Sequence, residues 1–140
     1  MQSFEFEHTI RFTRMGGFSL PIVTVTLITE SGSDIEIPLL FDTGASVTTF
    51  KSDLYPYFGL SSWDEGQLVA DIATAGGVAM AYRYDATLEF YGKRIDCPVL
   101  LMEMPKNPLF SGLLGRHTIM QEFGFAFYES TERLYVTENP

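Results

Sequence analysis

Apolar and polar residues alternate along most of this chain, which is the pattern of half-buried β-strands. Every second residue from 35 to 41 is apolar, and residues 22–28 (Ile-Val-Thr-Val-Thr-Leu-Ile) are rich in β-branched side chains. Both features suit a pleated sheet. Residues 30–34 (Glu-Ser-Gly-Ser-Asp) between them are typical of a turn. We therefore expect these two strands to pair as a hairpin.

Further strands follow from the same alternation. Residues 4–12 predict an opening strand, which Met15-Gly16-Gly17-Phe18 then breaks. The other expected strands are residues 68–73 and 78–90, forming a hairpin around Thr74-Ala75-Gly76-Gly77, residues 94–103, and a closing hairpin of residues 125–128 and 134–137.

Two short helices complete the prediction. Ser52 is a fair N-cap, Pro56 falls in the first turn where proline is tolerated, and Gly59 suits the C-terminal cap. Residues 115–123 have room for a helix of about two turns. The sequence thus predicts an all-β fold with two short helices, in a single domain of residues 1–140.

Composition and charge exclude several classes of function. With 46% hydrophobic and 14% aromatic residues in 140, the chain has ample material for a core. Its net charge of -9 lacks the basic surface that binds nucleic acid or an anionic membrane. No apolar run reaches the roughly 18 residues of a membrane-spanning helix. We expect neither nucleic acid nor membrane as a partner.

The sparse cysteines and histidines bear on compartment and metals. Cys97 is the single cysteine, so no disulfide forms within the chain, and His8 and His117 have no ligand partners at metal-binding spacing. Cys97 is expected to be a small buried hydrophobe. The first residues lack a secretory signal, so we expect a cytoplasmic protein, although a domain cut from a longer precursor would look the same.

The segment richest in chemistry is Leu39-Leu40-Phe41-Asp42-Thr43-Gly44-Ala45-Ser46. An apolar strand delivers Asp42 directly into a turn, and a carboxylate at such a position needs donors around it or a partner that shares its proton. Gly44 allows a sharp turn and close approach of a ligand. A plain Asx-turn at a strand end would give the same tripeptide.

In context, Asp42-Thr43-Gly44-Ala45-Ser46 resembles the active-site motif of aspartic proteases. Leu113-Leu114-Gly115-Arg116, an apolar pair and glycine ahead of a short helix, is similar to a second element of that family. The glycine-rich hairpin at residues 74–78 falls between them, where the family has its substrate-covering flap. The resemblance covers most of residues 21–137, and residues 1–20 lie outside it.

The chain has one such Asp motif, which resembles the retropepsin-like branch, whose members form homodimers in which each copy donates one Asp. The resemblance implies an aspartic endopeptidase acting on polypeptides, without metal or organic cofactor. The implied catalytic residues are Asp42, Thr43 and Gly44; the implied substrate-binding residues are Ala45, Ser46, Ala75, Gly76, Gly77, Leu109 and Phe110; and the implied structural support is Leu114, Gly115 and Arg116.

In such a pair of carboxylates the two groups share one proton and titrate as a unit. The ionised member takes a proton from water, and the protonated member donates to the peptide carbonyl. Ala45 lacks a hydroxyl that pepsin-like proteins have, so the ionised form loses a donor, and we predict activity at mildly acidic to near-neutral pH. Ser46 stands where viral enzymes often carry a second Asp, which leaves the partner of Arg116 open.

Several alternatives remain open at this level. Gly76 and Gly77 suit a tight hairpin turn as well as a flap, and Leu109 and Phe110 suit a core as well as a pocket. Ser46 as a nucleophile is disfavoured because no Gly-x-Ser-x-Gly elbow exists. The rival to an enzyme is a non-catalytic retropepsin-like dimer that binds peptides or acts as a scaffold, because a fold can outlast its activity. A dimer without any peptide groove is a third option.

Overall fold

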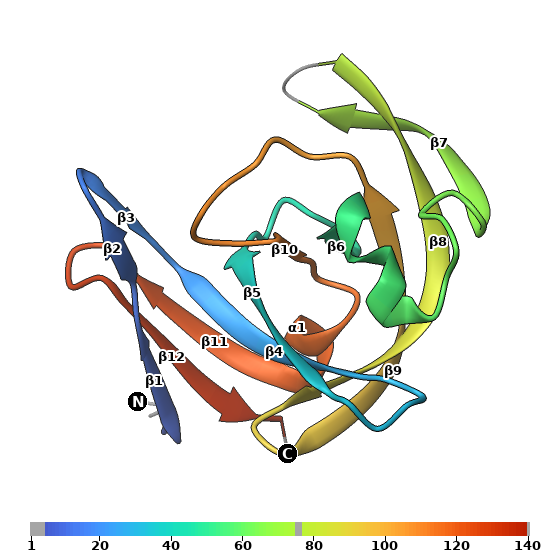
Figure 1. Ribbon diagram of the computed structural model, residues 1–140. Coiled ribbons are helices and arrows are strands. Elements are labelled where there is room, and N and C mark those ends of the chain that lie inside the picture. Colours follow the sequence, from blue (N-terminus) through green and yellow to red (C-terminus); the bar gives the residue numbers. More distant parts are fainter. Residues whose placement is uncertain (1–4, 75–76, 140) are drawn as a thin grey trace.

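The computed structural model describes residues 5–74 and 77–139, and β-strands dominate it (Figure 1). Short helices interrupt the strands at two places: the 3-10 helix η1 (Ser52–Phe58) and the α-helix α1 (Ile119–Glu122). The strands in chain order are β1 (His8–Arg11), β2 (Thr13–Met15), β3 (Phe18–Leu20), β4 (Ile22–Ile28), β5 (Ile35–Phe41), β6 (Thr48–Lys51), β7 (Gln67–Thr74), β8 (Gly77–Phe90), β9 (Lys93–Met102), β10 (Gly112–Leu114), β11 (Phe123–Tyr128) and β12 (Arg133–Glu138).

Six of these strands close into a barrel. The largest sheet has the order β4-β5-β10-β6-β9-β8-β7, and β4 also pairs with the far end of β8, at residues 87–89. That extra pairing closes the sheet into a ring. Strand β7 stays outside the ring and pairs with the N-terminal half of β8. The ring encloses the main core, where fully buried apolar residues from five strands meet: Val23, Leu39, Phe50, Leu101 and Leu114.

The long alternating segments fold as predicted. Strands β4 and β5 coincide with the expected ranges and pair antiparallel, with Ile22 opposite Leu40 and Leu27 opposite Ile35. The β7–β8 hairpin, β9 and the closing β11–β12 hairpin also form, each with ends shifted by one or two residues. Alternation identifies these strands because each has one face on the core and one toward solvent.

Other expectations were wrong in extent. The opening strand is only His8–Arg11, and the segment expected to break it forms a small β2–β3 hairpin. The helix expected over residues 115–123 is a single turn, Ile119–Glu122: residues 116–118 form a turn, and the N–H groups of Arg116 and His117 donate to the Ala45 and Ser46 carbonyls instead of within a helix. Ser52 is the first residue of η1 rather than its N-cap, whereas Gly59 does cap its end with φ of 72°.

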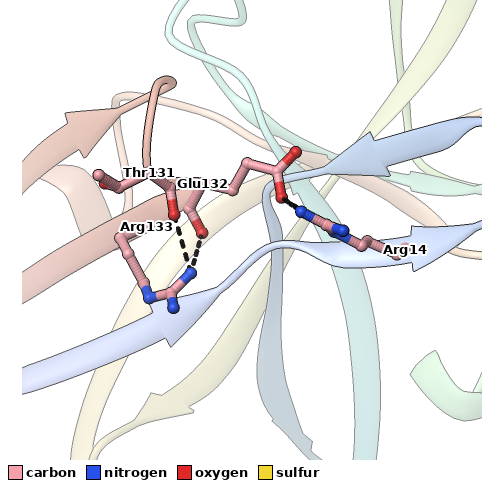
Figure 2. A network of polar contacts seen from close by, with 4 residues as sticks. All are labelled: Arg14, Thr131, Glu132 and Arg133. Carbon is pink, nitrogen blue, oxygen red and sulfur yellow. Dashed lines mark hydrogen bonds and ion pairs between the residues drawn. The ribbon is translucent and has the colours of Figure 1, made fainter.

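The N-terminal segment packs onto the end of the chain. Strand β1 pairs antiparallel with β12, which gives a three-stranded sheet in the order β1-β12-β11. Arg14 on β2 forms an ion pair with Glu132, in the β11–β12 turn, and Arg133 donates to the carbonyl oxygens of Thr131 (2.8 Å) and Glu132 (3.1 Å) (Figure 2). Strands β1 and β2 are thus tied to the C-terminal hairpin.

Candidate active site

The turn that carries Asp42 is built around an inserted strand. Strands β5 and β6 follow each other in sequence but are not neighbours, because β10 lies between them. Strand β10 is parallel to β5, with Leu114 beside Phe41, and antiparallel to β6, with Leu113 beside Thr49. Residues 42–47 must therefore pass around the end of β10, and Asp42 comes to lie at the C-terminal end of β5.

Backbone hydrogen bonds from the segment after β10 fix this turn. The Asp42 N–H donates to the Leu114 carbonyl (3.2 Å), the Arg116 N–H to the Ala45 carbonyl (3.0 Å), and the His117 N–H to the Ser46 carbonyl (2.8 Å). The structure therefore brings Leu114, Gly115 and Arg116 against the Asp42 turn, and their supporting role in a catalytic site stays a prediction. Their contribution is largely main-chain: the Arg116 side chain is exposed and forms no ion pair among the described residues.

Gly115 is required by the close approach of the two chain segments. A Cβ atom at this position would lie 2.4 Å from the Val47 carbonyl carbon and 2.7 Å from the Thr48 nitrogen, well inside van der Waals contact. No other residue lets the backbone after β10 lie this close to the turn. The glycine of the second motif thus has a structural explanation that does not depend on any ligand.

A buried pair of threonines reinforces the same contact and was missed from the sequence. Thr48 Oγ1 accepts from the Gly115 N–H (3.0 Å), and Thr118 Oγ1 donates to the Gly115 carbonyl (2.9 Å). The two hydroxyls are 2.7 Å apart, so the Thr48 proton must point to Thr118, and every group is satisfied. Both side chains are buried. Threonines are too common for the sequence alone to have marked these two.

The Asp42 carboxylate is held on one side and open on the other. Oδ1 accepts the Gly44 N–H at 2.9 Å, and the Ala45 N–H donates to the Asp42 carbonyl at 3.2 Å. Oδ2 accepts no hydrogen bond from the described residues. Asp42 is half-buried, while Thr43, Gly44 and Ser46 are exposed. The geometry contains an Asx-turn, and the turn presents a carboxylate oxygen that is free to bind water or share a proton.

Aromatic rings border the site. Phe41, the residue before Asp42, contacts Phe125 at 5.1 Å and Phe127 at 6.3 Å between ring centroids. Both partners lie on β11, so the end of this strand is close to the Asp42 turn.

Figure 1 shows the β5–β6 connection and the loop between β9 and β10 in the upper half of the view, with the end of the β7–β8 hairpin above them.

The structure describes only some of the remaining predicted substrate-binding residues. Gly77 begins β8 with φ of 117°, whereas Ala75 and Gly76 lie outside the described residues. Leu109 and Phe110 are half-buried in the loop before β10, and the Leu109 N–H donates to Asn107 Oδ1 at 2.8 Å. Their role in a pocket stays a prediction.

Two grooves of the single chain lie away from Asp42. One, of about 570 Å³, lies between β1 and the outer face of the barrel and includes Glu36 and Glu89. The other, of about 930 Å³, lies between the β4–β5 turn, η1 and β8. Neither includes a residue of the Asp42 turn. Neither groove is therefore a peptide-binding cleft at Asp42.

Comparison with known proteins defines the fold class. No protein-family model matches the chain, and no curated protein matches it. Among solved structures the chain is similar to the EIAV protease complexed with the inhibitor HBY-793, with a TM-score of 0.56 and 21% sequence identity over 78% of this chain and 92% of that chain. The chain has the fold of a retroviral protease, which confirms the predicted fold class. Within the described residues, no helix is both long and apolar enough to cross a bilayer.

Proposed function

We propose that this protein is an aspartic endopeptidase whose two catalytic carboxylates, both Asp42, come from two copies of the chain. The observation that carries the proposal is the Asp42 turn itself: a carboxylate at the end of a barrel strand, fixed by Gly44 and by the segment after β10, with one oxygen open. The retroviral-protease fold supports it. One chain supplies one such carboxylate, so the site is complete only in a homodimer.

The proposed chemistry uses a single shared proton. Two carboxylates in contact cannot both be ionised, so one keeps a proton and the pair acts as acid and base together. The ionised oxygen removes a proton from a water molecule, which attacks the peptide carbonyl while the protonated oxygen donates to the carbonyl oxygen. The tetrahedral intermediate then collapses with proton transfer to the amine. Peptide and water are consumed, and no acyl-enzyme forms.

The surface around the turn is suited to contact between two copies. Strand β11 is an edge strand that pairs only with β12 among the described strands, and its sequence, Phe-Gly-Phe-Ala-Phe-Tyr, contains no charge. Phe127 and Tyr128 are 47% and 53% exposed. Natural proteins normally protect an edge with charges or cover it. Because β11 contacts Phe41, pairing two such edges would bring the two Asp42 turns near one axis.

The expected substrate is an extended, largely apolar peptide bound as an added strand. The β7–β8 hairpin supports this because Leu68 and Met80 are 49% and 57% exposed on it. In this proposal the hairpin serves as the flap, with Gly77 next to its tip. We expect the protein to work in the cytoplasm, where its lone Cys97 would stay reduced.

The catalytic proposal is tested with Asp42→Asn. Wild type and variant are incubated with an unfolded protein between about pH 4 and pH 7, with and without a statine inhibitor that mimics the tetrahedral intermediate. We expect cleavage by the wild type only, blocked by the inhibitor, and strongest at mildly acidic to near-neutral pH. Peptide binding without cleavage by both proteins would instead support a non-catalytic scaffold, and equal cleavage by both would exclude Asp42.

The proposed contact surface has its own test. Tyr128→Lys places a charge at the exposed end of β11, and Tyr57→Lys on η1, where Tyr57 is 45% exposed, is the matched control. Sedimentation should show at least about a tenfold weaker dimer for Tyr128→Lys and no change for Tyr57→Lys. A dimer that both variants leave intact would place the interface elsewhere.

A further inference from the structure

Tyr84, opposite Val99 of β9, lies three residues from the point where strand β8 leaves the barrel. Residues 81–90 of β8 pair with β9, and that pairing ends at Ala81, opposite Met102. Beyond it, residues 77–80 of β8 lie outside the β9 pairing, and their ladder partner is β7. The β7–β8 hairpin therefore projects from the barrel as a two-stranded ribbon, as Figure 1 shows at the upper right. An isolated two-stranded ribbon has little stability of its own.

The ribbon contains a discontinuity at the same level. The register of β7 against β8 shifts between Val69, opposite Ala81, and Ile72, opposite Ala79. Two residues of β7 thus face one residue of β8, which is the arrangement of a β-bulge. Bulges bend a strand and re-aim what lies beyond them. Residues 72–74 of β7 and 77–79 of β8 consequently lie beyond the point where both the support of β9 and the regular ladder end.

The base of the hairpin is tied down by one hydroxyl group. The Tyr84 hydroxyl donates to the Trp63 carbonyl at 2.6 Å and accepts the Gly66 N–H at 2.7 Å. Both partners belong to the loop that leads into β7. Trp63 also packs edge-on against Tyr82, with ring centroids 5.1 Å apart. The Tyr84 side chain of β8 therefore holds the loop that leads into β7.

Gly66 is part of this contact. A Cβ atom on Gly66 would lie 2.5 Å from the Arg83 carbonyl oxygen and 2.7 Å from the Tyr84 ring. Only glycine lets the loop lie directly on the tyrosine ring. On its other side, Tyr84 faces Phe58 of η1 at 6.4 Å between ring centroids, and Phe58 packs on the buried Phe50. The contact thus connects the hairpin base to the barrel core.

We infer that Tyr84 is a positioning residue: its hydroxyl holds the base of the β7–β8 hairpin and so sets the direction in which the two strands leave the barrel, and hence where the hairpin lies relative to a peptide at Asp42. The role toward a peptide rests on the proposed function, whereas the clamp itself does not. The clamp also gives Trp63 and Gly66 a role, through a main-chain oxygen and a main-chain N–H. Tyr84 has no contact with the reacting atoms in this proposal.

The test compares Tyr84→Phe with Tyr82→Phe in the full chain. The Tyr82 hydroxyl has no hydrogen-bond partner among the described residues, so its removal is a matched control. Amide hydrogen exchange of residues 67–80 should rise about tenfold or more in Tyr84→Phe, because two hydrogen bonds are lost. Exchange in β4 and β5 should stay as in the wild type, and Tyr82→Phe should match the wild type throughout. Gly66→Ala should raise exchange in the same segment by displacing the loop.

A kinetic readout separates positioning from general support. The KM for a cleaved peptide and the Kd of a statine inhibitor should rise about tenfold in Tyr84→Phe, with kcat within about twofold. Three results of the exchange experiment would each overturn the clamp. They are unchanged amide exchange at residues 67–80 in Tyr84→Phe, an equal rise in exchange in Tyr82→Phe, and a rise in exchange that extends into β4 and β5. Unchanged KM and Kd with raised exchange would overturn the positioning role. If the wild type neither cleaves nor binds the inhibitor, the proposed function fails while exchange still decides the clamp.

Discussion

At the scale of single residues, the Asp42 turn depends on groups that carry no charge. The buried hydroxyls of Thr48 and Thr118 satisfy both the N–H and the carbonyl of Gly115, the residue that lies against the turn. A buried amide group without a partner costs more than its hydrogen bond contributes when made. These threonines therefore hold the position of a carboxylate that neither of them touches.

Replacing Thr118 by valine tests this arrangement. The change keeps the shape but removes the donor to the Gly115 carbonyl and the acceptor for Thr48, so we expect a loss of about 1–3 kcal/mol in the free energy of unfolding. Denaturant unfolding measures it. Thr24→Val, at an exposed position of β4, is the control and should change stability by less than about 0.5 kcal/mol. Equal effects at the two positions would contradict the proposed network.

Cys97 offers a second residue-level prediction. Burial, with smaller contributions from the Asp96 and Asp85 carboxylates, raises the pKa of the Cys97 thiol to about 11. At about pH 8 the thiolate is scarce, so a thiol reagent should label the native protein very slowly and the unfolded protein rapidly. Because the folded pKa lies above the unfolded value, this group's contribution to stability is complete below about pH 9 and is lost as pH rises through about 11. Rapid labelling of the native protein would contradict this.

At the scale of elements, the sequence predicted best where a strand has one wet face. Strands β4 and β5 were predicted to the residue, β4 from its β-branched side chains and β5 from its alternation. Strands β6 and β10 were missed because they are short and lie in the middle of the sheet, so no alternation marks them. The Asp42 motif located the turn, and the second motif located its support. The insertion of β10 between β5 and β6 could not be predicted from the sequence, because it pairs segments that lie about seventy residues apart.

The N-terminal elements give a pH-dependent prediction. Arg14 on β2 donates a hydrogen bond to Glu132 in the β11–β12 turn and so connects these two elements (Figure 2). The same hydrogen bond lowers the pKa of Glu132. A carboxyl with a lowered folded pKa contributes stability above its unfolded pKa, and the contribution is lost as pH falls through the folded pKa. Glu132→Gln should therefore lower Tm near neutral pH and have no effect in strong acid. Thermal unfolding across pH checks this, with the exposed Glu30→Gln as control. A Tm difference that persists in acid would contradict it.

At the scale of the whole molecule, charge opposes the proposed assembly. Each chain carries a net charge of -9, so two copies repel one another at long range. The proposed contact through β11 is uncharged and gains nothing from ion pairs. Raising salt from about 0.05 M to about 0.5 M should screen the repulsion and strengthen the dimer several-fold in sedimentation. A dimer that weakens with salt would show that ion pairs hold it.

The threading of β10 also bears on how the protein is made. The turn that presents Asp42 takes its hydrogen bonds from residues 114, 116 and 117, which leave the ribosome long after Asp42 itself. A nascent chain that ends before Gly112 has the aspartate but neither the central strand nor the glycine that the turn lies against. Contacts so distant in sequence form late in folding. Incomplete translation products would therefore carry the carboxylate without the hydrogen bonds that hold its turn in place.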